Sequence, residues 1–135
     1  DFHFFHSKRV EKSFWQSHAL LDEEVGRQLR LGLEQGRDTR LPRVRWHRGF
    51  RAFVEEALPL SLTDVDAGYF AHVGASSPCP SSVGRALVVV GPEGGFIPYE
   101  VERLEEAGLQ PVGLGSRPLR VETACVALAA RLALR

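Results

Sequence analysis

Three features of this sequence predict an α/β fold built on a mainly parallel sheet. Short runs rich in β-branched and aromatic residues, such as 86–90, alternate with longer stretches of helical periodicity, such as 22–35. Glycine and proline fall between several of these segments, where the chain must turn. With 135 residues, of which 44% are hydrophobic, the chain can bury a core as one domain.

The first third of the chain is predicted to hold a strand, a loop and a helix. Residues 2–6 form the strand, and residues 7–17 form a polar loop. A helix is expected over 22–35, because Asp22 can cap it and the two glutamates that follow favour the positive end of its dipole. Gly36 marks its end. Apolar residues recur on one face of this helix, at Val25, Leu29 and Leu33.

The middle of the chain is predicted to alternate between strands and a short helix. A strand covers 44–46, a helix covers 50–58 until Pro59 stops it, and a second strand covers 68–73. Residues 74–82 are rich in serine and proline and look like a linker. This segment is too short to separate two domains.

The last third of the chain is predicted to contain two strands, at 86–90 and 111–114, and two helices, at 98–107 and 123–134. Proline at the start of the first helix and glycine after its end match the usual asymmetry of helix ends. The final helix is apolar nearly all round, so we expect it to be buried on more than one side. A homodimer interface and the chain's own sheet are equal alternatives for covering it.

Composition narrows the classes of function. Seventeen basic side chains balance seventeen acidic ones, so the net charge gives no indication of a polyanionic partner. Cys79, Cys125 and the five histidines show no metal-ligand spacing, so no metal is expected, and two such cysteines fit a reducing cytosol. No apolar run is long enough to span a bilayer, so we expect a cytoplasmic protein with no membrane partner.

The most informative motif is Gly-Pro-Glu-Gly-Gly-Phe at 91–96, between a strand that ends at Val90 and a predicted helix. Backbone N–H groups at such a position can bind an anion or a cofactor. The motif matches neither a Walker loop nor a Gly-x-Gly-x-x-Gly fingerprint, and by itself a tight structural turn is an equal alternative. A second block at 114–124 favours a binding site, because it crowds charged and polar residues beside the final helix: Arg117, Arg120, Glu122 and Thr123.

Basic residues concentrate between positions 37 and 51, with Asp38 as the one acidic residue up to Arg51 and with Trp46 and Phe50 among them. This combination is typical of a nucleic-acid backbone site with base stacking. An exposed edge strand made basic to discourage aggregation is the alternative interpretation. The arginines of this stretch are Arg37, Arg40, Arg43, Arg45, Arg48 and Arg51.

Together, the blocks at 91–96 and 114–124 resemble the paired signature of the ribosomal RNA small subunit methyltransferase E family, within the knotted SPOUT superfamily. Residues 32–42 are similar to a third, looser motif of that family. The resemblance implies a homodimeric SPOUT methyltransferase domain with a C-terminal trefoil knot, an exception to the rule that chains do not thread their own loops. It also implies an upstream strand and helix and an N-terminal PUA-like β-barrel domain. Because this chain lacks them, we expect residues 1–135 to be a methyltransferase domain truncated at its N-terminus.

The activity that the resemblance implies is methylation of N3 of a uridine in 16S rRNA of the small ribosomal subunit, with S-adenosylmethionine as the methyl donor. In the family, backbone from three loops holds this donor. The corresponding residues here are Ala71, His72, Val73, Gly91, Glu93, Gly94, Gly95, Leu114, Gly115, Arg117, Leu119, Arg120 and Thr123.

Catalytic roles carried over from the family fall on Arg120, Arg37 and Glu93. The two guanidinium groups suit the RNA phosphate or the uracil oxygens. Glu93 is expected to bind the ribose hydroxyls or the methionine amine, or to help accept the N3 proton. Capping of the final helix is an equal alternative for Glu122 and Thr123. RNA binding is assigned to Arg37, Arg40, Arg43, Arg45 and Arg48.

A second function from another class stays open at this point. The chain would then be a non-catalytic RNA-binding or ribosome-assembly module that keeps the knotted fold. Binding of S-adenosylmethionine or its product distinguishes the two functions, because the non-catalytic module has no need of a methyl donor.

Overall fold

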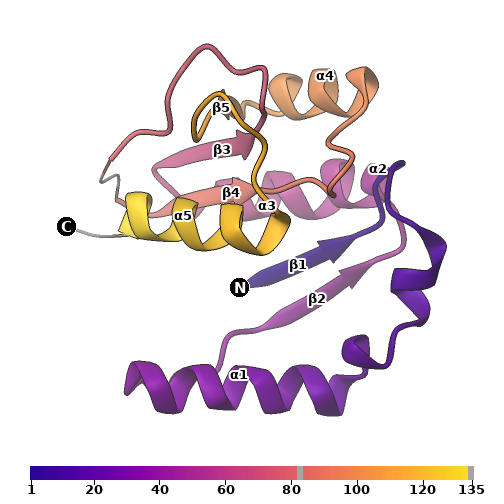
Figure 1. Ribbon diagram of the computed structural model, residues 1–135, viewed down its shortest axis with the longest axis vertical. Coiled ribbons are helices and arrows are strands. Elements are labelled where there is room, and N and C mark those ends of the chain that lie inside the picture. Colours follow the sequence, from indigo (N-terminus) through magenta and orange to yellow (C-terminus); the bar gives the residue numbers. More distant parts are fainter. Residues whose placement is uncertain (82–83, 134–135) are drawn as a thin grey trace.

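The computed structural model describes residues 1–81 and 84–133 of the chain. Within them, Figure 1 shows two parallel sheets, one ordered β1-β2 and one ordered β4-β3-β5. The predicted parallel pairing is confirmed, although β1 and β2 form a sheet of their own that the sequence pattern did not indicate. The strands are β1 (Phe2–Phe5), β2 (Val44–His47), β3 (Ala67–Ala71), β4 (Ala86–Val89) and β5 (Gln110–Val112).

Helical segments follow β1, β2 and β4, whereas no helix lies between β3 and β4 in the residues that the structure describes. Two short 3₁₀ helices, η1 (Lys12–Gln16) and η2 (His18–Leu20), lie largely in the segment that we predicted to be a plain loop. The other helices are α1 (Asp22–Gly36), α2 (Phe50–Ala52), the π-helical η3 (Phe53–Ala57), α3 (Leu58–Leu62), α4 (Pro98–Glu106) and α5 (Val121–Ala133).

Both ends of α1 differ from the prediction in detail. Leu21 occupies the N-cap position, so Asp22 lies in the first turn and makes no capping hydrogen bond there. Gly36 is the last helical residue, and Arg37 takes the left-handed conformation after it, with φ of 52°. A residue other than glycine in that conformation is uncommon, because its Cβ crowds the neighbouring backbone.

Pro59 does not end the helix that begins at Phe50, contrary to the prediction. The helical segment continues to Leu62, because Pro59 falls in the first turn of α3, where its missing N–H costs little. The turns before it widen into η3, and a local π-helical stretch of this kind relieves the clash between a proline ring and the preceding turn.

The three-stranded sheet separates two apolar clusters, because neighbouring residues of a strand point to opposite faces. Phe70 of β3 packs with Leu58 and Leu104, which come from α3 and α4 on one face. Tyr69 packs with Leu128 and with other residues on the opposite face, which α5 covers. The helices therefore hold the three-stranded sheet from both sides (Figure 1).

Within the chain, one face of α5 is buried against the chain's own sheet, which is one of the two alternatives for covering this helix. Ala124, Leu128 and Leu132 recur every four residues and pack against the sheet. Val126, on another face of the same helix, is 70% exposed. The chain's own sheet covers this stripe, whereas Cys125, Val126, Ala129 and Ala130 are exposed and Ala127 is half-buried.

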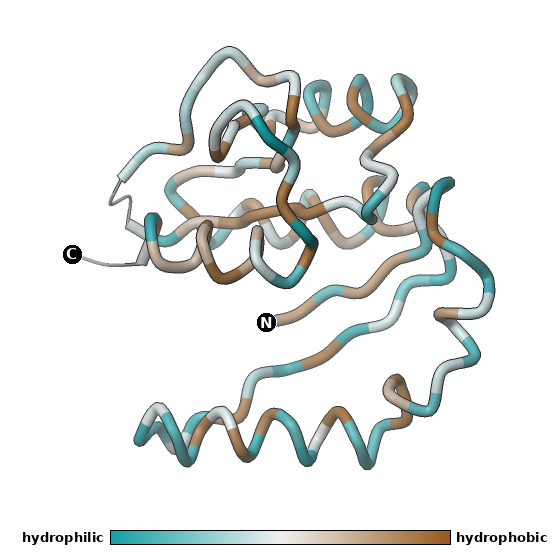
Figure 2. The backbone as a smooth tube through the Cα atoms, in the orientation of Figure 1, coloured by the Kyte–Doolittle hydropathy of each residue, from teal (hydrophilic) through white to brown (hydrophobic). Residues whose placement is uncertain are grey.

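The helix α1 is amphipathic but lightly packed. Figure 2 shows apolar and polar positions alternating along it, and none of its residues is buried. The predicted apolar stripe of Val25, Leu29 and Leu33 is half-buried. None of the helices that the structure describes is long and apolar enough to cross a membrane.

Candidate functional site

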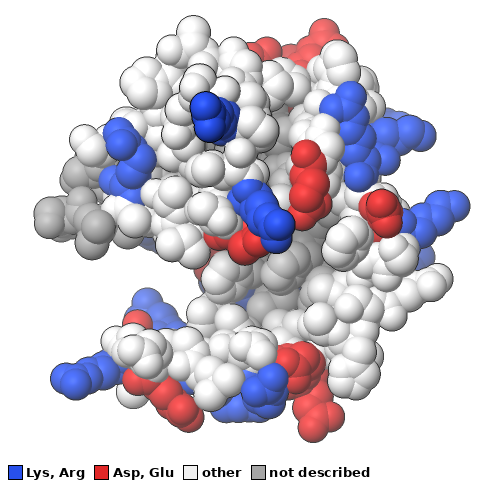
Figure 3. Space-filling model, viewed as in Figure 1, with Lys and Arg blue, Asp and Glu red and all other residues white. Residues whose placement is uncertain are grey.

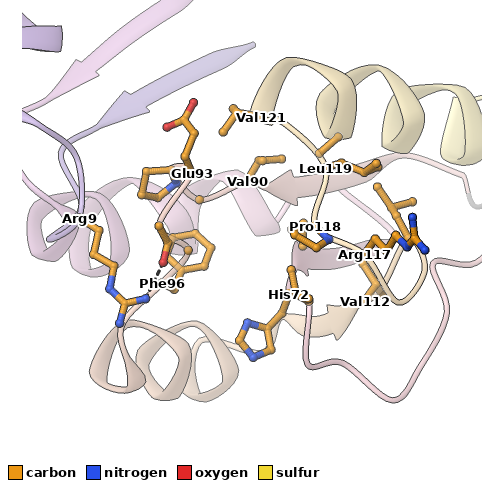
Figure 4. Close-up of a pocket in the computed structure, with 18 of the residues that line it drawn as sticks. Arg9, His72, Val90, Glu93, Phe96, Val112, Arg117, Pro118, Leu119 and Val121 are labelled. Atoms are coloured by element: carbon orange, nitrogen blue, oxygen red, sulfur yellow. Dashed lines mark hydrogen bonds between the residues drawn. The ribbon is translucent and has the colours of Figure 1, made fainter.

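The three strands of the larger sheet end at the same edge, and the loops that follow them meet there. In an open parallel sheet this edge is where ligands bind. A pocket of about 260 Å³ lies between the loops after β3, β4 and β5 and the first turn of α5 (Figure 4). This volume is near the lower end of small-molecule sites, which begin at about 300 Å³.

Most residues predicted to hold the cofactor line this pocket. They come from three segments that are far apart in the sequence, and the structure brings them together as the prediction requires. Those residues are Ala71, His72, Val73, Gly91, Glu93, Gly94, Gly95, Leu114, Gly115, Arg117 and Leu119.

Arg120 and Thr123 are the predicted cofactor residues that do not line the pocket. Arg120 is exposed, and its backbone oxygen accepts a hydrogen bond of 2.8 Å from the N–H of Ala124. Because α5 begins at Val121, Glu122 and Thr123 lie inside its first turn rather than at the N-cap position. Helix capping at the N-cap therefore does not explain these two residues, and Glu122 suits the positive end of the helix dipole.

Contacts or backbone conformation within the protein explain why glycine occupies each of its three positions in the 91–95 turn. A Cβ on Gly91 would lie 3.1 Å from the ring of Phe96, and a Cβ on Gly94 would lie 3.1 Å from Cδ of Arg9. Gly95 has φ of +67°, a conformation that disfavours other residues. The tight structural turn and the binding site were alternatives in the sequence, and the structure shows the turn and the pocket in the same residues.

The pocket wall is mainly apolar, with few polar side chains. Figure 4 shows Val90, Leu119 and Val121 on the side of the pocket nearest α5. The side chains of Glu93 and His72 extend in opposite directions from this wall. An apolar wall with a few polar groups and exposed backbone is typical of a site for a small organic molecule.

Two residues at this site, Arg9 and Glu100, were not identified from the sequence. Arg9 follows β1, lines the pocket and donates a hydrogen bond from Nη1 to the backbone oxygen of Gly94. Glu100 lies in α4, is only 2% exposed, and its Oε1 accepts a hydrogen bond from the N–H of Lys8. The sequence indicated only a basic loop between β1 and α1. That loop lies far from the glycine-rich turn in the sequence, so the pattern did not connect the two.

The basic stretch at 37–51 does not form one surface. In β2, Arg45 lies opposite His3 and Trp46 lies opposite Phe4, so these two β2 side chains point to different faces of the small sheet. Arg43 forms an ion pair of 3.0 Å with Asp1. Figure 3 shows basic side chains separated by acidic and uncharged ones, with a hollow between the part that contains α1 and the rest.

Trp46 is available for stacking, but Phe50 is not. Trp46 stacks on Phe4 with ring centroids 4.7 Å apart and meets Trp15 edge to face at 6.1 Å. Trp46 and Phe4 remain partly exposed. Phe50 is buried in the core at 7% exposure, so the prediction that it could stack on a base is wrong.

Arg37, predicted to be catalytic, lies at the exposed C-terminal end of α1 and outside the pocket lining. The turn after it is fixed by Asp38, whose carboxylate accepts hydrogen bonds from the N–H groups of Thr39 at 2.6 Å and Arg40 at 3.0 Å. The N–H of Arg40, followed by that of Thr39, lowers the pKa of Asp38. Arg37 and Arg40 are therefore presented together on a defined turn.

A metal site is not found at this pocket or elsewhere in the described part of the chain. No group of three or more His, Cys, Asp or Glu side chains within residues 1–81 and 84–133 could hold a metal ion.

Comparison with known proteins relates this geometry to one family. A family model described as an RNA methyltransferase domain matches residues 1–133. The ribosomal RNA small subunit methyltransferase E of Mesomycoplasma hyopneumoniae is 41% identical over 49 residues, 36% of this chain and 22% of that protein. The ribosomal RNA small subunit methyltransferase E 1 of Borreliella burgdorferi is 22% identical over 138 residues, 92% of this chain and 52% of that protein. This chain therefore spans about half the length of the Borreliella burgdorferi protein.

Solved structures show the same fold. A probable rRNA-methyltransferase from Porphyromonas gingivalis has a TM-score of 0.67 and 26% identity, over 94% of this chain and 51% of that one. A putative methyltransferase from Legionella pneumophila, solved with the bound cofactor SAM, has a TM-score of 0.68 and 24% identity, over 95% of this chain and 52% of that one.

Proposed function

This chain belongs to the RNA methyltransferase domain family, and from that we propose that it methylates ribosomal RNA with S-adenosylmethionine as the methyl donor. The observation that carries the proposal is the pocket in which residues of all three predicted cofactor loops meet. The predicted relationship to ribosomal RNA small subunit methyltransferase E is confirmed by the family match and by the curated relatives. We further propose that the target is N3 of a uridine in 16S rRNA.

The residues of the pocket fit such a cofactor. Leu114, Leu119 and Val90 offer apolar surface for a flat adenine ring, while the loop backbone offers donors and acceptors for its polar edge. Gly115 has φ of +127°, which turns the backbone at the pocket and leaves no side chain there. When bound, the cofactor supplies an electrophilic methyl group on a sulfonium. The chain holds it in place and excludes water from one side.

Transfer to N3 of uracil needs placement, loss of the N3 proton and stabilisation of charge on the uracil oxygens. Glu93 is the exposed carboxylate of the pocket lining, and we propose it to bind a polar group of the cofactor or to accept this proton. Arg120 adjoins the pocket lining in sequence, and we propose its guanidinium to hold an RNA phosphate or an uracil oxygen.

We also propose that the chain acts as a homodimer through the outward face of α5. The exposed residues of α5 include the small or apolar Cys125, Val126, Ala129 and Ala130, and Val126 is 70% exposed. Because neither Arg37 nor Arg120 lines the pocket of its own chain, a partner's basic residues would complete the RNA site. The trefoil knot belongs to the same proposal, supported by the shared pocket of residues 91–96 and 114–121.

Transfer of a labelled methyl group to 16S rRNA or to the small ribosomal subunit tests the activity. We expect label in RNA and, after digestion to nucleosides, mass-spectrometric identification of 3-methyluridine. Methylation at another position would keep the methyltransferase and reject the N3 assignment. A folded chain that binds rRNA but neither binds the cofactor nor methylates any rRNA substrate would support the non-catalytic RNA-binding module instead.

The Arg120→Ala variant tests the assignment of Arg120 in the same assay. We expect methyl transfer to fall on the order of 100-fold, the cost of losing one charge-stabilising donor. The melting temperature should stay close to that of the parent chain, because the side chain is exposed and its helix contact is made by the backbone. A parallel loss of melting temperature and activity would make Arg120 a structural residue.

A further inference from the structure

The loop after β1 contacts the glycine-rich turn and the α4 helix that follows it, at one point each. We infer that residues 8 and 9 form a clasp on this turn, and that Glu100 and Arg9 are positioning residues for the pocket. The term clasp refers here to the hydrogen bond from Lys8 to Glu100 together with the hydrogen bond from Arg9 to Gly94. Its catalytic consequence rests on the proposed function, whereas its effect on the turn does not.

The first point of the clasp is a buried carboxylate. Oε1 of Glu100 accepts the N–H of Lys8 at 2.8 Å, and Oε2 accepts the N–H of Ile97 at 3.0 Å. Ile97 is the N-cap residue of α4, directly after the glycine-rich turn, and Lys8 is 92 positions away from Glu100. Burial of a carboxylate at 2% exposure is costly without such charge-assisted hydrogen bonds. Glu100 therefore ties the start of α4 to the loop after β1.

The second point of the clasp is Arg9. Its guanidinium donates to the carbonyl oxygen of Gly94, and Figure 4 shows this bond beside Phe96. The aliphatic part of Arg9 lies against Gly94 so closely that a Cβ there would be 3.2 Å from Cβ of Arg9. The absence of a side chain at Gly94 is therefore explained by Arg9. Both contacts fix residues 94–97 relative to β1.

The consequence for the pocket follows from the position of the turn. Residues 91–96 form one wall of the pocket, and Gly95 is held within the turn by a hydrogen bond of 2.8 Å to Pro92. Binding of a ligand that requires one position of this wall costs less conformational entropy when the wall is already fixed. Loosening the clasp should therefore weaken cofactor binding. Arg9 lines the pocket whereas Glu100 does not, so Glu100→Gln loosens the clasp without changing the pocket lining.

The experiment compares Glu100→Gln and Arg9→Met with two exposed controls, Glu102→Gln in α4 and Arg30→Met in α1. Isothermal titration gives the affinity for S-adenosylhomocysteine, and hydrogen exchange with mass spectrometry reports the backbone of residues 91–97. In Glu100→Gln one carboxylate oxygen becomes an NH₂ donor, so one of the two hydrogen bonds is lost. We expect about tenfold weaker binding and faster exchange at 91–97 in both clasp variants, a change of about 1.4 kcal/mol.

Rescue separates positioning from general stability. Arg9→Lys keeps a donor for the Gly94 oxygen, so we expect it to restore affinity and exchange close to the parent values, unlike Arg9→Met. Affinity equal to that of the controls in both clasp variants would overturn the inference, as would unchanged exchange at 91–97. If Glu100→Gln does not fold, hydrogen exchange at 91–97 in the Arg9 pair decides the question, because Arg9 lines the pocket and its effect on affinity includes any direct contact. If the parent chain binds no S-adenosylhomocysteine, the proposed function fails, and exchange at 91–97 still decides whether the clasp exists.

Discussion

At the scale of single residues, two glycines differ in how well their positions would tolerate a side chain. Gly95 has φ of +67°, whereas Gly32 lies within α1 with no atom near the position of an added Cβ. We expect Gly95→Ala to lower the free energy of unfolding by about 1 kcal/mol, because alanine is strained in that conformation. Gly32→Ala should raise it by about 0.5–1 kcal/mol through helix propensity.

Urea unfolding of the two variants under one condition measures this difference. The prediction depends on the sign as well as the size, since the same substitution should act in opposite directions at the two sites. Two destabilised variants of similar size would contradict the conformation described for α1 or for the turn.

A pair of histidines gives the chain a pH dependence. Nδ1 of His3 in β1 lies 3.0 Å from Nε2 of His47 in β2. Burial first, and then the charges of His47, Arg45 and the N-terminus, lower the pKa of His3 from 6.5. The unfolded chain therefore takes up this proton at a higher pH than the folded chain does. The stability contributed by a neutral His3 is complete above about pH 6.5 and is lost as the pH falls toward the lower folded value.

We accordingly expect the free energy of unfolding, measured in urea, to decrease between about pH 7.5 and about pH 5.5. His3→Gln should flatten this decrease, because glutamine does not titrate. His18→Gln is the matched control, since His18 lies exposed in η2. An identical pH dependence in His3→Gln and in the parent chain would remove His3 as its source.

At the scale of elements, α5 has one face that stabilises the fold and another that is free. Leu128 is 1% exposed against the sheet, so Leu128→Ala should cost about 2–5 kcal/mol of unfolding free energy. Val126→Glu lies on the outward face and should change this free energy by less than about 0.5 kcal/mol. In sedimentation, however, we expect Val126→Glu to shift the proposed dimer to monomer.

Sedimentation of the parent chain as a monomer at micromolar concentration would remove the dimer from the proposal. Large destabilisation by Val126→Glu would instead mean that the outward face packs within the chain. The two measurements are independent, because unfolding reports the buried face and sedimentation reports the exposed one.

At the scale of the whole molecule, local patterns predicted the elements well and their assembly less well. The strands and most helix bounds follow from short-range periodicity, and the motifs pick out the loops that line the pocket. The contacts of Arg9 and Glu100 were not accessible, because they join residues more than 80 positions apart. The basic residues of 37–51 do not share one surface, because neighbouring side chains of β2 point to opposite faces of the sheet. A count of charges along the sequence does not include this alternation.

The separation of the two sheets is likewise a property of the whole chain. Strand periodicity predicts that a segment is extended but does not specify which strands pair. The apolar sequence of α5 likewise predicts that the helix is buried but does not specify which surface covers it. Both points concern long-range packing rather than local structure.

The central claim is that the pocket between the three loops holds the methyl donor. Isothermal titration of the chain with S-adenosylhomocysteine tests it most directly, with circular dichroism to verify that the sample is folded. We predict saturable binding with one site per chain, weakened at least about tenfold by Leu119→Glu, which places a charge at an exposed lining position. A folded parent chain that binds no S-adenosylhomocysteine, or one whose affinity Leu119→Glu leaves unchanged, would contradict the account.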